Sequence, residues 1–124
     1  MLGTAALIAF VATTEPTRAK TFYGATLGLA LVADEQFALV YDANGTMLRI
    51  QKVSEHVPVR STALGWKVSD IREAVASLSA KGVRFQRFAG LTQDADGIWT
   101  SPLGPLVAWF KDPDGNVLSL TQLA

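Results

Sequence analysis

The chain of 124 residues repeats one pattern twice, and this repeat is the feature that most constrains its fold. Each copy reads as a strand, a helix, a second strand and a β-hairpin. A repeat of this kind indicates two similar supersecondary units. The sequence therefore predicts an α+β fold of two βαβββ modules, paired by a pseudo-twofold axis. Module one is expected at about 1–53, a linker at 54–60 and module two at about 61–124.

The two predicted helices match in length and in the residues that begin and end them. The first helix signal opens at Thr14 and closes at Gly28, and the second opens at Asp70 and closes at Gly82. Asp70 has Glu73 three residues later, which is a capping-box arrangement, and glycine suits the left-handed residue after a helix. Apolar residues follow the helical period: Ala19, Phe22, Tyr23 and Leu27 in the first helix, and Ile71, Ala74, Val75 and Leu78 in the second.

The two hairpins are predicted at 37–51 and 106–121, with turns at Asn44-Gly45 and Asp114-Gly115. Such dipeptides between apolar runs are the strongest short hairpin signals. The remaining strands are expected on either side of each helix, at about 6–12, 29–34, 62–68 and 83–88.

The segment 89–104 has no counterpart in module one. It is rich in Gly and Asp, and 98–100 is read as an extra short strand. Long loops in compact domains are often functional, and a plain connection is the alternative interpretation.

Composition excludes several classes of protein. Apolar residues make up 49% of the chain, which favours a globular domain with a substantial core. Eleven basic residues balance eleven acidic ones without a basic run, so no nucleic-acid partner is expected. Cysteine is absent, which excludes disulfides and thiolate ligands and fits a cytoplasmic location. The apolar run 5–12 is read as a buried strand rather than a signal peptide, because no Lys or Arg precedes it, and no run is long enough for a membrane helix.

Alternation in the last strand of each module separates a core face from an open face. Leu48 and Ile50 alternate with Arg49 and Gln51, and the second module has the same pattern. There, Leu118 and Leu120 alternate with Ser119 and Thr121. Period two places the polar residues opposite the core. A mixed sheet built from two such modules is expected to curl, and its concave, polar face is either a cup suited to a ligand or a plain solvated face.

Two motifs resemble one known family. The segment 15–23, Glu-Pro-Thr-Arg-Ala-Lys-Thr-Phe-Tyr, followed by Leu27-Gly28-Leu29, resembles the first-helix signature of the glyoxalase/bleomycin-resistance/extradiol dioxygenase (vicinal oxygen chelate) superfamily. The segment 109–116, Trp-Phe-Lys-Asp-Pro-Asp-Gly-Asn, resembles its last hairpin. Together with the repeat, the resemblance covers nearly the whole chain and implies the same fold.

The resemblance also implies a divalent metal held by four residues, and this chain departs from that pattern at every position. Ser119 and Arg49 stand where the last strand of each module would carry Glu, and Ala63 stands where His is usual. Residues 1–14 contain no His, Asp, Glu or Cys. A guanidinium places a fixed positive charge where a cation should bind. We therefore expect no metal and no cofactor.

The residues expected to bind a ligand are polar residues of the open face and aromatic residues that could form a wall. Arg49 needs an acceptor, which is either a ligand oxygen or a structural carboxylate. Of Trp109 and Phe110, alternation sends one to the core and the other to the cup, and the sequence leaves open which. The full set is Arg49, Gln51, Ser119, Thr121, Ala63, Phe37, Trp99, Trp109 and Phe110.

Two further patterns point to structure rather than chemistry. His56, the single histidine, falls in the linker with no nucleophile motif in the chain. Residues 94–97, Asp-Ala-Asp-Gly, lack the remainder of a calcium loop and are read as a turn.

The resemblance to drug-sequestering members implies a metal-independent protein that binds an apolar or aromatic compound, such as an antibiotic, without a catalytic residue. It also implies a homodimer, with pockets within one chain or between subunits. The alternative is a glyoxalase-like lyase, isomerase or dioxygenase with an atypical metal site. A third interpretation is a structural or regulatory module whose cup is filled by its own side chains.

Overall fold

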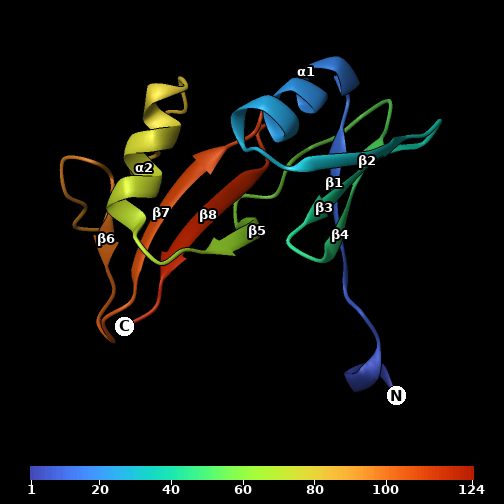
Figure 1. Cartoon of the computed structure of the whole chain (residues 1–124). Helices are drawn as coiled ribbons and strands as arrows, with labels where there is room; N and C mark the ends of the chain where they lie inside the picture. Colours follow the sequence, from blue (N-terminus) through green and yellow to red (C-terminus); the bar gives the residue numbers. More distant parts are fainter. The chain divides into compact units, whose positions relative to one another are not determined.

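The computed structural model describes all residues, 1–124, and divides into two compact units, Met1–Pro58 and Val59–Ala124 (Figure 1). The division falls within the segment expected as a linker. Each unit contains one mixed four-stranded sheet with helical segments. The predicted α+β architecture of two similar modules is therefore confirmed. No helix is both long enough and apolar enough to cross a membrane.

Unit one begins with a short 3-10 turn and then follows the predicted order. Its sheet has the order β1-β4-β3-β2, in which β1 runs parallel to β4 and the other pairs are antiparallel. Its elements are η1 (Leu2–Thr4), β1 (Ile8–Thr13), α1 (Pro16–Thr21), the π-helical η2 (Phe22–Thr26), β2 (Ala30–Asp34), β3 (Ala38–Ala43) and β4 (Thr46–Lys52).

The helical segment of unit one buries the apolar face that the sequence predicts. Ala19 and Tyr23 are fully buried, and Tyr41 of β3 donates a hydrogen bond to the Lys20 carbonyl at 3.0 Å. Its start differs from the prediction, because Thr14 lies outside α1 and Glu15 is the cap residue before Pro16. The preceding Thr13 hydroxyl accepts the Glu15 N–H at 3.0 Å, and proline is preformed for the first helical position.

Unit two repeats the arrangement with the sheet order β5-β8-β7-β6, in which β5 is parallel to β8. The Asp70 carboxylate accepts the Glu73 N–H at 3.1 Å, so the predicted cap of the second helix is confirmed. This helix packs against β7 and β8. The elements are β5 (Thr62–Lys67), α2 (Ile71–Ala80), β6 (Trp99–Thr100), β7 (Leu106–Lys111) and β8 (Val117–Gln122).

The prediction of a strand at 83–88 is wrong. Only Phe85 forms a β-bridge, to Phe110, and the edge of the sheet is taken instead by the short strand β6. The side chain of Gln93 takes over the hydrogen bonds that a strand partner would make. It donates to the Gln86 carbonyl at 2.9 Å and accepts the Phe88 N–H at 2.8 Å.

Candidate functional site

The open face of the second sheet carries Trp109, and the core face carries Phe110. Trp109 of β7 lies opposite Ser119 of β8 in the antiparallel register. Phe110 points the other way, is fully buried and packs against Phe85 with ring centroids 5.5 Å apart. Of these two residues, between which the sequence does not decide, Trp109 is therefore the one on the open face. Phe110 does not line the site.

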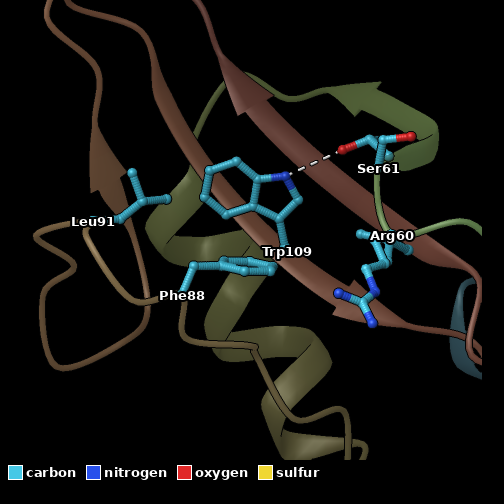
Figure 2. Close-up of a pocket in the computed structure, with 7 residues that line it drawn as sticks. Arg60, Ser61, Phe88, Leu91 and Trp109 are labelled. Atoms are coloured by element: carbon cyan, nitrogen blue, oxygen red, sulfur yellow. Dashed lines mark hydrogen bonds between the residues drawn. The ribbon is translucent and has the colours of Figure 1, made fainter.

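A pocket of about 360 Å³ lies beside Trp109 (Figure 2). This volume is within the range of small-molecule sites. Leu91 and Arg60 lie at its opposite ends, with Trp109 and Phe88 between them. All of its lining belongs to unit two: Arg60, Ser61, Thr62, Phe88, Leu91, Trp109 and Val117.

Two aromatic rings line this pocket and a third lies behind them, and a hydrogen bond fixes the central ring, that of Trp109. Trp109 meets Phe88 edge to face, with ring centroids 5.3 Å apart. Trp99, one of the residues predicted to form an aromatic wall, lies 5.9 Å from Trp109 without lining the pocket itself. The Trp109 indole N–H donates to the Thr62 hydroxyl at 3.2 Å. The polar edge of the indole is thus satisfied, and its ring remains as an apolar surface.

The segment between α2 and β6 supplies Phe88 and Leu91, and hydrogen bonds hold it in place. Arg87 donates to the carbonyls of Asp94 and Ala95 at 2.8 and 2.9 Å. The Asp94 carboxylate accepts the Ile98 N–H at 2.9 Å and pairs with Arg72 of α2 at 2.8 Å. The hydrogen bond from Arg72, helped by the backbone N–H groups, holds the pKa of the Asp94 carboxyl below its ordinary value of 3.8, against the opposing effect of partial burial.

The other residues predicted from unit two lie near the pocket without lining it. Ser119 is nearly buried beside Gly65, where an added Cβ would lie 2.7 Å from the Ser119 Oγ. The register partner of Ser119 is Gly65, and Ala63 lies at the shift in register between Thr62 and Leu64. Ala63 and Thr121 also lie outside the pocket lining.

The residues predicted from unit one are separate from this pocket. Arg49 donates to the Glu35 carboxylate at 3.0 Å, so its partner is a structural carboxylate, one of the two alternatives that the sequence left open. Gln51 shares the Arg49 face of β4, and Phe37 is 71% exposed just before β3. None of the three lines the pocket beside Trp109.

Of the residues that line the pocket, sequence reasoning predicts only Trp109 and misses Arg60, Ser61, Thr62, Phe88, Leu91 and Val117. Arg60 was assigned to the linker and Phe88 to a strand. A signal for Arg60 was available, because the strand predicted at 62–68 begins two residues after it. Phe88 and Leu91 carried no comparable signal, since their segment follows no regular pattern.

The family's divalent metal does not fit the residues at the corresponding positions. Ser119 has one hydroxyl, Arg49 is a cation already paired with Glu35, and Ala63 has no donor. On β1, Ile8 and Phe10 share the Arg49 face, and both are apolar. No three or more His, Asp or Glu side chains gather as a metal-binding group anywhere in the chain. Divalent ions need several converging carboxylate or imidazole donors, and this set does not provide them.

The fold places the molecule among the α+β proteins built from two βαβββ modules. The model of the Glyoxalase/Bleomycin resistance protein/Dioxygenase superfamily matches residues 5–120, and the chain belongs to this superfamily. Comparison with curated proteins gives no significant match.

Solved structures with the same fold include three bacterial relatives of low sequence identity. A lactoylglutathione lyase from Agrobacterium tumefaciens is 14% identical, with a TM-score of 0.73 over 95% of this chain and 93% of that one. A glyoxalase/bleomycin resistance protein/dioxygenase from Alicyclobacillus acidocaldarius is 16% identical, with a TM-score of 0.72 over 96% and 91%. A superfamily member from Sphaerobacter thermophilus is 24% identical, with a TM-score of 0.72 over 95% and 98%. At these identities the likeness shows the fold alone.

Proposed function

We propose that this protein is a metal-independent binding protein that holds an aromatic or largely apolar small molecule in the pocket beside Trp109. The observation that carries the proposal is a partly exposed, hydrogen-bonded indole flanked by Phe88 at the edge of a pocket of ligand size. A planar ring that enters this pocket can stack on one aromatic face and meet the edge of another. Aromatic pairs of this kind contribute about 0.5–1.5 kcal/mol beyond the area that they bury.

The proposal includes sequestration of a compound such as an antibiotic as the biological use. This part depends on the resemblance to drug-sequestering members of the superfamily, as do the expected homodimer and the cytoplasmic location. The donor chemistry supports metal independence, because Arg49 and Ser119 replace carboxylate ligands. No feature of the site favours the alternative, a glyoxalase-like lyase, isomerase or dioxygenase.

The test is calorimetric titration of the EDTA-dialysed protein with 2-naphthamide, a neutral planar probe. We expect saturable binding at one site per chain. The Phe88→Leu variant should bind about three- to tenfold more weakly, because it loses the edge-to-face partner of Trp109 while keeping apolar volume.

The matched control is Phe10→Leu on β1. Phe10 is 50% exposed and Phe88 is 37% exposed, so the two substitutions remove similar exposed rings. Phe10→Leu should bind the probe as the parent protein does. If neither 2-naphthamide nor its carboxylate analogue 2-naphthoate bound saturably to the parent protein, the proposed function would be overturned. An equal loss in both variants would overturn the placement of the site beside Trp109.

A further inference from the structure

The pocket beside Trp109 has one charged residue, and that residue has no partner in the chain. Arg60 lies at one end of the lining and is exposed. Its guanidinium forms no ion pair or hydrogen bond, whereas Arg49, Arg72 and Arg87 all bind acceptors. An arginine presents five N–H donors and no acceptor. The Arg60 end of the pocket therefore presents N–H donors that no acceptor of the chain satisfies.

A second donor of the lining is the hydroxyl of Thr62, two residues after Arg60. The Thr62 Oγ1 already accepts the indole N–H of Trp109 at 3.2 Å. Its own proton makes no hydrogen bond within the chain and is available for donation. The oxygen of this hydroxyl accepts the indole N–H of Trp109. Its O–H is therefore the group that Thr62 can donate to a ligand. Two lining residues of the segment 60–62 thus both present donors.

We infer that the ligand of this pocket is an aromatic anion, with its ring beside Trp109 and Phe88 and a carboxylate toward Arg60 and Thr62. The inference rests on the proposed function and narrows its ligand class. A carboxylate matches the fork of the guanidinium and can accept the hydroxyl proton as well. The apolar residues at the other end, Leu91 among them, suit the ring and would not solvate a charge.

The test compares 2-naphthoate with 2-naphthamide, which have the same ring system and differ in charge. Calorimetric titration of the full chain should give a dissociation constant about tenfold lower for naphthoate, the value expected for one charge-assisted interaction at an exposed site. Raising the salt from low to about 0.5 M should reduce this preference, because screening weakens the attraction between exposed charges.

Two variants locate the source of the preference. Arg60→Gln should bring the ratio of the two dissociation constants close to one. Arg84→Gln removes an equally unpaired, exposed arginine of the same unit that lies outside the pocket, and it should keep the tenfold ratio. Thermal melting of both variants checks that each is folded.

The outcomes separate this inference from the proposed function. Binding of both probes with equal affinity would overturn the anionic ligand class and leave the aromatic pocket standing. Failure of both probes to bind would overturn the proposed function itself. A naphthoate preference that Arg84→Gln abolishes as fully as Arg60→Gln would also overturn the inference, since it would reflect net charge alone.

Discussion

At the scale of single residues, the carboxylate of Asp112 organises the turn between β7 and β8. Asp112 is nearly buried and accepts three hydrogen bonds, from the Asp114 N–H, the Asn116 N–H and the Asn116 side-chain amide, at 2.8–2.9 Å. These residues lie in the hairpin segment that resembles the superfamily signature. The signature here therefore has a structural role, because its acidic residue binds its own turn.

Asp112→Ala should lower the free energy of unfolding by about 2–4 kcal/mol, because it leaves buried N–H donors without an acceptor. Urea denaturation measures the loss. Asp42 is the matched comparison in the first hairpin, where an exposed carboxylate accepts only the Gly45 N–H at 2.9 Å. Asp42→Ala should cost less than about 1 kcal/mol, within the range of a single exposed hydrogen bond. Equal losses in the two variants would contradict the role given to Asp112.

Gly65 is required for the close approach of β5 to β8. Gly65→Ala should destabilise the protein by about 1 kcal/mol, because its Cβ would force the Ser119 Oγ to move. Adding Ser119→Ala should recover most of that loss, which a double-mutant cycle of urea denaturation measures. A double variant whose cost is simply the sum of the two single costs would show that the contact is not responsible.

At the scale of elements, the ion pair between α2 and the segment 86–98 makes the stability of that segment depend on pH. The folded state lowers the pKa of Asp94, so its ionised form is the one that folding favours. The stabilisation is complete above the ordinary value of 3.8 and is lost as the pH falls through the lower folded pKa.

Asp94→Asn should therefore speed hydrogen exchange of the Asp96 and Ile98 amides at pH 7. It should also reduce the loss of stability that the parent protein shows as the pH falls below 4. Mass-spectrometric hydrogen exchange and acid titration of the melting temperature measure these effects. Asp96→Asn is the control, because the Asp96 side chain accepts no hydrogen bond. If Asp96→Asn had the same effect, the general loss of negative charge would account for it.

The elements that the sequence predicted correctly are those whose signals are local. Asn44 and Gly45 both adopt positive φ, which is what their two-residue turn requires, and Asp70 caps α2 through its own side chain. The edge strand expected in unit two does not form, because a side chain from elsewhere in the chain makes the hydrogen bonds that a neighbouring strand would make. The Gln93 side chain satisfies the backbone near Phe88, and no periodicity in 83–88 could reveal that.

At the scale of the whole molecule, the repeat predicted the fold but not the place of the site. The modules share their predicted element order, whereas the pocket takes Phe88 and Leu91 from a part of unit two that has no regular strand or helix. Trp109 and Trp99 could be proposed from the sequence because they lie on or beside predicted strands. Phe88 and Leu91 could not, since side-chain and loop hydrogen bonds determine where their segment lies.

The absence of a suitable donor set predicts how the protein responds to metals. Addition of Zn²⁺, Mn²⁺, Ni²⁺ or Fe²⁺ at ten times the protein concentration should leave the melting temperature of the EDTA-dialysed protein within about 1 °C. A tightly bound ion would instead stabilise the folded state by mass action, by about 2.7 kcal/mol at one hundred times its dissociation constant. A shift of several degrees, or stoichiometric metal after purification, would contradict metal-independent binding.

The hydrogen bond between Trp109 and Thr62 has a kinetic consequence. Because the indole is already anchored before any compound arrives, the largest apolar surface of the pocket does not need to turn when one enters. Association with planar compounds should then be limited by diffusion and by the charge of Arg60, with little contribution from rearrangement. Differences in affinity among such compounds should appear mainly in how long each one stays bound.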